Sequence, residues 1–251
     1  MAIILVDQNK SSYDFTLLDI IQTTMAELGL PVPSFAIGNT EQNISQALKL
    51  LRAAGIELVY AYPWAQLNVE WGFNTVSGVD KYELPDNWAY FIDQTHWDRT
   101  NHWPLLGPKI PQEWQWLKGG LISQGPRIRY RIRNGNIQFH PIPGDSPFQL
   151  YMEYISKYWV TDNEGLTPKP VFTRDDDKFY LDPFLLIKFL KFKIKDAKGF
   201  DTTGVLSQFQ RYYSELIGQD ASAPILNMSP RVRPILLGPN NLPDGNWQVG
   251  I

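Results

Sequence analysis

The sequence predicts an α+β protein: a helical bundle of two hairpins with an inserted antiparallel β-module and an extended C-terminal arm. Two changes in hydrophobic period lead to this prediction. Apolar residues recur at helical spacing over residues 12–62 and again over 183–217, whereas residues 66–159 alternate with a period of two. The last 33 residues show neither period and contain five prolines, which is typical of an extended segment.

The domain boundaries follow from these patterns. We expect an N-terminal helical hairpin in residues 1–64, the β-module with a short helix in 65–160, a linker and second hairpin in 161–218, and the arm in 219–251. The two hairpins are expected to pack together, because each leaves an apolar stripe that another element must bury. The chain has 251 residues and no cysteine, and a chain of this length buries a stable core without disulfides.

The first hairpin is defined by its start and stop signals. Ser12 or Asp14 is expected to cap the first helix, which ends before Gly29. The second helix is expected to begin at Thr40 and to end at Pro63.

The β-module contains one strong hairpin signal, the turn around Asn134-Gly135, because Asn-Gly favours the tight turn between antiparallel strands. Other segments also alternate between apolar and polar residues, and one segment follows a helix-start signal. The expected strands cover residues 69–74, 76–84, 89–95, 127–133, 137–142 and 148–159, and a short helix is expected over residues 111–119.

The second hairpin is expected over residues 183–198 and 203–217. The linker before it contains three consecutive aspartates, Asp175, Asp176 and Asp177. Carboxylates of this kind can bind a hard cation. Neighbouring carboxylates in a loop point in different directions, however, so a solvated loop is the favoured interpretation.

Composition and motifs argue against an enzyme. The 23 basic and 26 acidic residues do not suit a surface that binds nucleic acid or anionic membrane throughout. The three histidines, His96, His102 and His140, lack metal-ligand spacing, and no nucleophile elbow or phosphate loop is present. We therefore expect no catalytic residue, no metal site and no cofactor. Neither a signal peptide nor an apolar stretch of about 20 residues is recognisable, so we expect no membrane association.

Two basic patterns are candidate interfaces. Four arginines alternate along one predicted strand and point to one face, which is either a solvent face that protects a strand edge or a docking strip for phosphates or carboxylates. Four lysines form one stripe on the third long helix, which is either solvated or faces another subunit or DNA. These residues are Arg127, Arg129, Arg131 and Arg133, and Lys188, Lys191, Lys195 and Lys198.

The arm combines prolines with apolar residues that it cannot bury by itself. A disordered tail is the alternative, but such tails contain fewer Ile and Leu residues. We therefore expect the arm to bind another protein chain, by strand addition or by docking of its prolines against aromatic side chains. The residues expected to make this contact are Ile225, Leu226, Pro230, Pro234, Ile235, Leu236 and Leu237.

Four motifs resemble one family. They are the helical segment from Ile21 to Gly29, the segment Glu57-Leu-Val-Tyr-Ala-Tyr-Pro-Trp64, the segment Tyr82-Glu-Leu-Pro-Asp-Asn-Trp88, and Asp98-Arg-Thr-Asn101. In this order they resemble the head-to-tail adaptor (connector) proteins of short-tailed bacteriophages, the tail tubular protein A-like connectors, over residues 12–218.

The resemblance implies a structural virion protein without enzymatic activity. Members form a homo-oligomeric ring, typically of twelve copies, at the portal vertex after synthesis in the host cytoplasm. The ring joins the portal protein ring to the tail nozzle protein and lines the channel through which genomic DNA passes.

Two other functions stay open at this stage. One is a tail-associated peptidoglycan or glycan hydrolase that uses a carboxylate pair, and the other is a glycan-binding module that uses exposed tryptophans. The candidate carboxylates for the hydrolase are Glu70, Glu83, Asp86, Asp93 and Asp98.

Overall fold

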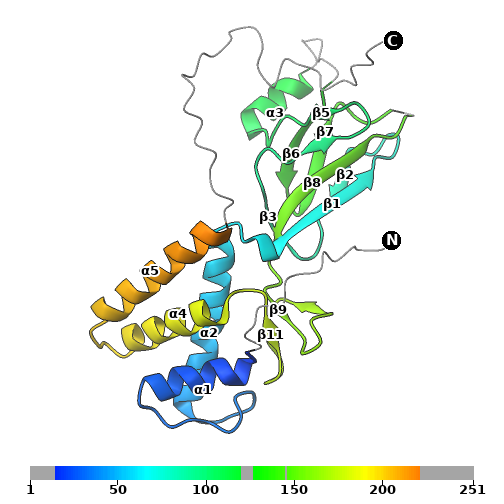
Figure 1. Cartoon of the computed structure of the whole chain (residues 1–251). Helices are drawn as coiled ribbons and strands as arrows, with labels where there is room; N and C mark the ends of the chain where they lie inside the picture. Colours follow the sequence, from blue (N-terminus) through cyan, green and yellow to red (C-terminus); the bar gives the residue numbers. More distant parts are fainter. Residues whose placement is uncertain (1–14, 120–126, 145, 221–251) are drawn as a thin grey trace, which may run out of the picture. The chain divides into compact units, whose positions relative to one another are not determined.

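The computed structural model describes residues 15–119, 127–144 and 146–220 (Figure 1). Over these residues the chain forms five α-helices and antiparallel sheets, so the predicted α+β class is confirmed. The described residues divide into two compact units. We call residues 15–68 and 155–220 the helical unit, and residues 69–154 the β-module.

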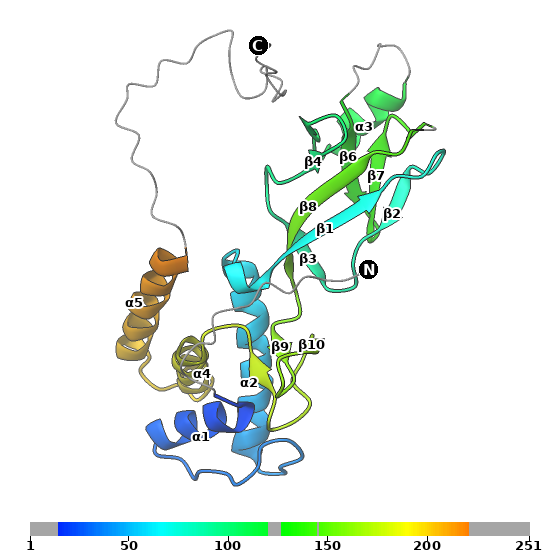
Figure 2. The same cartoon turned by 45° about the vertical axis from the view of Figure 1, so that its right-hand side comes forward.

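The helical unit is organised around its central helix, α4. Its helices are α1 (Leu17–Glu27), α2 (Gln42–Ala61), the short 3-10 helix η1 (Ala65–Leu67), α4 (Pro183–Ala197) and α5 (Thr203–Asp220). Helix α4 packs against α1, α2 and α5 (Figures 1 and 2). The side chains of Leu185, Leu186 and Leu190 in α4 are fully buried. The helix is apolar on more than one side because it contacts helices on more than one side.

Helix α1 begins with a capping box rather than at the predicted caps. The Thr16 Oγ1 accepts a hydrogen bond from Asp19 N (3.3 Å), and the Asp19 carboxylate accepts one from Thr16 N (2.9 Å). This reciprocal pair satisfies two backbone donors at once, which a single cap does not. The predicted caps, Ser12 and Asp14, lie outside the described residues.

The segment predicted as a linker forms part of the helical unit. Strands β9 (Val160–Thr161), β10 (Pro168–Lys169) and β11 (Lys178–Phe179) make a three-stranded antiparallel sheet. Next to it, the fully buried Trp159 stacks on Phe179 with ring centroids 5.4 Å apart. The six-membered ring of this indole lies so close to Gly55 of α2 that a Cβ there would overlap it.

The three aspartates do not form the solvated loop that the sequence suggested. Asp177 is 0% exposed, and its carboxylate accepts hydrogen bonds from Lys169 Nζ (2.6 Å) and Thr173 N (2.6 Å). Burial alone would raise the pKa of Asp177, but these donors, together with Arg174 N, outweigh burial and hold the pKa below its usual value.

The same loop completes the start of α1. Leu17 N donates to Asp177 O (2.8 Å), and Leu18 N donates to Asp175 O (3.1 Å). The first backbone N–H groups of a helix lack partners within the helix. Residues far away in the sequence therefore supply the acceptors for α1.

The β-module consists of two antiparallel sheets and one helix. Sheet A has the order β1-β8-β4-β5, with β3 also paired to β8, and sheet B has the order β2-β7-β6. The elements are β1 (Asn68–Asn74), β2 (Lys81–Glu83), β3 (Trp88–Phe91), β4 (Trp97–Asp98), β5 (Trp103–Pro104), α3 (Pro111–Lys118), β6 (Arg129–Arg133), β7 (Asn136–His140) and β8 (Gln149–Ser156).

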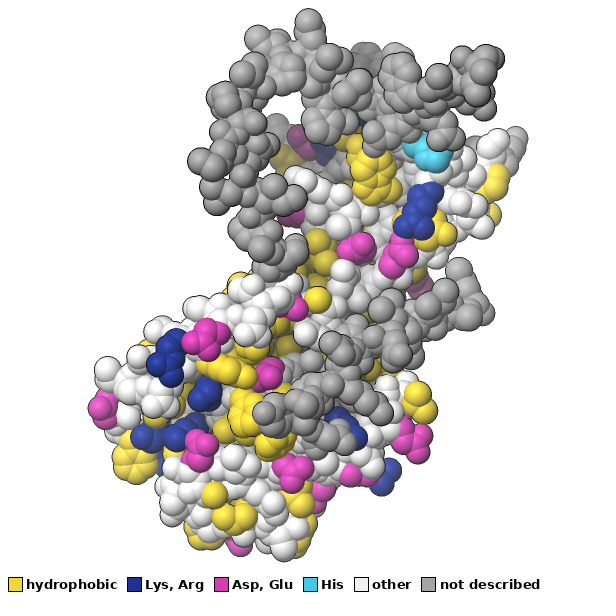
Figure 3. Space-filling model, viewed as in Figure 1, with side chains coloured by type: hydrophobic (Ala, Val, Ile, Leu, Met, Phe, Trp, Pro, Cys, Tyr) yellow, Lys and Arg dark blue, Asp and Glu magenta, His cyan; other side chains and the backbone are white. Residues whose placement is uncertain are grey.

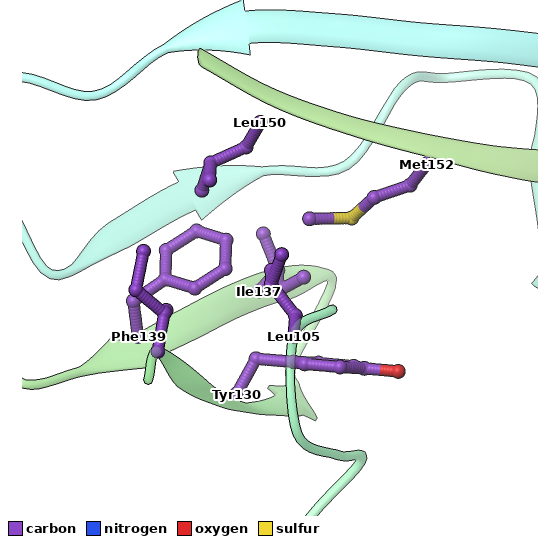
Figure 4. Packing of buried hydrophobic residues seen from close by; sticks show 7 residues of the cluster. Leu105, Tyr130, Ile137, Phe139, Leu150 and Met152 are labelled. Atoms are coloured by element: carbon purple, nitrogen blue, oxygen red, sulfur yellow. The ribbon is translucent and has the colours of Figure 1, made fainter. Parts of the chain in front are cut away.

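The two sheets pack face to face. Tyr130, Ile137 and Phe139 of sheet B meet Leu150 and Met152 of β8 in one buried cluster (Figure 4). Alternate residues of β6, β7 and β8 therefore point inward, and their neighbours point to the two outer faces.

The predicted hairpin turn is confirmed between β6 and β7. Asn134 and Gly135 have φ values of 51° and 70°. Two successive positive φ angles are what the tight hairpin turn requires, and Asn-Gly tolerates them better than other pairs.

His96 is a core residue of the β-module. Its side chain is only 4% exposed, and its ring stacks on Tyr130 at a centroid distance of 4.8 Å. Burial lowers the pKa of His96 from 6.5 to about 4, despite the opposing charge of Asp93.

This lowered pKa predicts an acid-sensitive β-module. As the pH falls, the unfolded chain binds the proton first, so the contribution of neutral His96 is complete above about pH 6.5 and is lost toward pH 4. We expect the free energy of unfolding to decrease by about 1–2 kcal/mol between pH 7 and pH 5. Urea unfolding at both pH values measures this decrease. His96→Phe keeps an aromatic ring and should remove most of this decrease, whereas an equal decrease in this variant would contradict the assignment.

Candidate functional site

The predicted arm contacts are not tested by the structure. Residues 225–237, which contain all seven of the arm residues named above, lie outside the described residues. Their role in binding a partner stays a prediction.

The arginine strip is the set Arg127, Arg129, Arg131 and Arg133. The last three lie in β6 and point to the outer face of sheet B, whereas Arg127 precedes this strand. The strip is only partly open to solvent, because α3 packs on this face. Arg131 Nε donates to Gln138 Oε1 (2.7 Å), and its guanidinium lies 4.7 Å from the ring centroid of Trp114 in α3. Arg133 is exposed.

Positive charge is concentrated around this strip. Burial, followed by the charges of Lys118 and Arg129, lowers the pKa of His140 on the adjacent strand β7. Burial and the neighbouring Arg133 likewise lower the pKa of Arg131, against the attraction of Asp80. One guanidinium nitrogen of Arg129, Nη1, is buried and has no acceptor among the described residues.

The lysine stripe on α4 contacts the other helices of the same unit. Lys191 pairs with Glu27 of α1 (2.8 Å), and Lys198 Nζ donates to Asn43 of α2 (3.2 Å). Lys188 Nζ lies 5.4 Å from the ring centroid of Tyr212 in α5. Basic and acidic side chains are interspersed over these helices in Figure 3. Three of the four lysines that were predicted to face a partner therefore contact other helices of the same unit. A contact of Lys195 or its neighbours with another subunit stays a prediction.

Sheet A carries a groove on its outer face that the sequence analysis did not identify. Its volume is about 470 Å³. We call it the sheet A groove, and it is lined by Glu70, Gln94, Thr95, Trp97, Asp98, Arg99, His102, Tyr151, Met152 and Glu153.

A stack of three residues lies beside this groove. The Tyr151 ring covers Gly72 of β1 so closely that a Cβ at Gly72 would overlap it. The Arg99 guanidinium lies 3.5 Å from the centroid of the Tyr151 ring and pairs with Glu70. A lone glycine in an alternating strand is the one sequence signal for such a close approach.

The groove carboxylates suit structural roles better than acid–base catalysis. Glu70 is held by Arg99. Asp98 is 3% exposed and accepts hydrogen bonds from Thr100 N (2.9 Å) and Asn101 Nδ2 (2.7 Å). The other hydrolase candidates, Glu83, Asp86 and Asp93, are not among the lining residues. Neither Glu70 nor Asp98 is therefore free to donate a proton to a substrate or to accept one from it.

Among residues 15–119, 127–144 and 146–220, no group of three or more His, Asp or Glu side chains is arranged to hold a metal ion. None of the described helices has the length and apolar character needed to cross a membrane.

Comparison with known proteins shows which family the chain belongs to. A family model described as "SU10 adaptor protein" matches residues 15–234, which include the described parts of both units. No curated protein matches the chain. The match supports the resemblance to a phage adaptor, while the narrower assignment as tail tubular protein A-like stays a prediction. The chain belongs to the SU10 adaptor protein family and is a structural adaptor protein of a bacteriophage.

Proposed function

We propose that this protein is a head-to-tail adaptor that joins the portal ring to the tail nozzle and lines the channel for the genome. The observation that carries this proposal is the family match over residues 15–234. An adaptor acts by contacting other components of the virion. In this proposal the protein assembles into a ring, of twelve copies in a short-tailed phage, and DNA passes through it only during ejection.

The two-unit architecture supports a bridging role. The helical unit and the β-module each have their own buried core, so each can present a stable surface to a different partner. We assign the helical unit to the portal and neighbouring subunits, and the β-module to the nozzle and neighbouring subunits.

Negative-stain electron microscopy with mass photometry tests this function. The full chain is measured alone and after mixing with the portal ring of the same phage. A ring of high-order symmetry in either sample supports the proposal. A chain that stays monomeric and leaves the portal unbound would overturn it, and a cell-wall zymogram would then test the hydrolase alternative.

Truncation of the arm is expected to separate folding from assembly. The cut belongs after Asp220, because the Asp220 carboxylate accepts a hydrogen bond from Ala65 N (3.0 Å) and is part of the helical unit. A chain ending at Asp220 should keep its melting temperature and lose about tenfold or more in portal affinity, the loss expected when apolar anchors are removed. Calorimetry and pull-down on portal rings measure the two quantities.

A matched variant isolates the apolar residues of the arm. Ile235→Ser combined with Leu236→Ser keeps the arm at full length and should reproduce the loss of affinity. Normal portal binding by both variants would show that the arm is not the anchor.

A further inference from the structure

Strand β1 lies at one end of sheet A. It pairs with β8 on one side, and no strand among the described residues pairs with its other side. Thr75, directly after β1, donates its N–H to Phe148 O directly before β8 (2.9 Å). Successive residues of a strand direct their N–H and C=O groups to opposite sides. Those of Glu70, Gly72 and Asn74 therefore point to the open side, which we call the β1 edge.

The β1 edge lacks the features by which proteins usually protect an open strand. The strand is seven residues long and contains neither proline nor lysine. Its one charged residue, Glu70, is already paired with Arg99. Valine and aromatic residues make the strand a good sheet former, so its edge is a template to which another strand can be added.

A row of half-buried aromatic side chains follows this edge on the inner face of sheet A. The Phe73 ring centroid lies 4.6 Å from that of Trp71 and 4.8 Å from that of Tyr82 in β2. Strand β2 is itself an edge strand of sheet B, so the row lies where both sheets end (Figure 2). A strand added at the β1 edge would extend sheet A over this row, and its inward apolar side chains would cover it.

One segment of the arm has the sequence pattern of such a strand. Proline has no N–H to donate to a sheet, and the longest run without proline in residues 221–251 is residues 244–251. Although the arm as a whole shows no period, apolar residues alternate with polar or small ones at the end of this run. These residues are Trp247, Gln248, Val249, Gly250 and Ile251. They give an added strand one apolar face.

The length of the arm favours a donor segment from another copy. Asp220, where the described residues end, accepts a hydrogen bond from Ala65 N (3.0 Å), and β1 begins three residues later. Because β1 is about 23 Å long, about ten extended residues would reach the far end of the chain's own β1. Residues 221–246 contain all five prolines of the arm. At about 3.1 Å per residue, a proline-rich spacer of this length spans about 80 Å.

We propose that the β1 edge of one copy binds residues 247–251 of a neighbouring copy by strand addition. The backbone groups of the edge pair with those of the added segment, and its apolar side chains cover the aromatic row. The proposal rests on the proposed function, because a contact between two different sites is heterologous and closes into a ring when the rotation permits. It leaves residues 225–237 available to bind the portal.

Cross-linking between two single-cysteine chains tests the contact, since the natural chain has no cysteine. One full-length chain carries Asn74→Cys, at an exposed position of β1, and the other carries Gln248→Cys. The two chains are mixed, with and without the portal ring, and treated with a bismaleimide. The expected product is a covalent dimer with one chain of each kind. Each chain alone should give little dimer, because a heterologous contact never brings two copies of the same site together.

A chain with both cysteines distinguishes a neighbouring copy from the chain's own arm. Binding between copies should give a ladder of covalent oligomers. If this chain gives only an internally cross-linked monomer and the mixture gives no mixed dimer, each arm binds its own β1 edge and the proposal is overturned.

Matched proline variants test the backbone pairing. Val249→Pro with Gly250→Pro, added to the Gln248→Cys chain, removes an N–H from each side of the segment. The yield of mixed dimer should fall about tenfold, as for the loss of a buried hydrogen bond. Asn240→Pro with Asn241→Pro is the control, because it adds two prolines to the same arm outside the segment, and it should leave the yield unchanged. Equal yields from the two proline variants would overturn the proposal.

Measuring portal binding in the same samples separates this contact from the proposed function. Portal binding without a mixed dimer in either condition overturns the strand addition and leaves the adaptor function in place. A mixed dimer without portal binding supports the strand addition and overturns the adaptor function.

Discussion

Replacing Asp177 with alanine is expected to lower the free energy of unfolding of the helical unit by about 3–5 kcal/mol, the range for removing one partner of a buried ion pair. The variant leaves Lys169, which is 21% exposed in its side chain, without its carboxylate. It also removes the acceptor for Thr173 N and Arg174 N. Because the same loop supplies the backbone acceptors for Leu17 and Leu18, the loss should spread to α1.

Two companion variants make this prediction specific. Asp177→Asn keeps an acceptor for the backbone donors but loses the ion pair, so its effect should be intermediate. Asp176→Ala removes an adjacent, more exposed carboxylate that pairs with Arg174 at 3.1 Å, and it should change stability by less than about 1 kcal/mol. Urea unfolding followed by the helical circular dichroism signal measures all three. Equal losses for Asp176→Ala and Asp177→Ala would contradict the role assigned to Asp177.

The second large effect is expected for Gly55→Ala in α2, with a loss of about 2–3 kcal/mol from overpacking. A glycine in the middle of a helix is normally improved by alanine. Here the Cβ would overlap the Trp159 ring. That ring is fully buried and is held by Phe179 and Phe172, so it has no open space to move into.

Gly218→Ala is the matched control for this prediction. Gly218 lies in α5 of the same unit, and a Cβ there meets nothing within 4 Å. This change should leave stability unchanged or raise it by up to about 1 kcal/mol. Calorimetric unfolding of both variants measures the difference. A stabilised Gly55→Ala variant would mean that α2 and Trp159 are not in close contact.

Local patterns were sufficient to predict the helices and the main hairpin, because their signals lie within a few residues of each other. The long-range partners were not predictable in this way. The Asp175–Asp177 loop looks solvated in sequence, yet its backbone carbonyls accept hydrogen bonds from Leu17 and Leu18, which are far from it in the sequence. No period or motif encodes a contact between segments so far apart.

For the candidate surfaces too, the sequence did not predict the contacts made with residues far away in the chain. The arginine strip was identified from its alternation, but nothing in the sequence indicates that Trp114 of α3 covers Arg131. The lysine stripe was also visible, whereas its pairing with Glu27 depends on how α1 and α4 pack. The sheet A groove was missed because its residues come from several strands, and only Gly72 marks its position locally.

The discontinuity of the helical unit determines the order in which the protein forms during translation. The ribosome releases residues 15–68 early, but α1 obtains its first acceptors only after residues 175–177 have emerged. The β-module is continuous over residues 69–154 and can complete its core in the meantime. The apolar faces of α1 and α2 therefore stay unburied, and accessible to chaperones and proteases, until the last third of the chain has been synthesised.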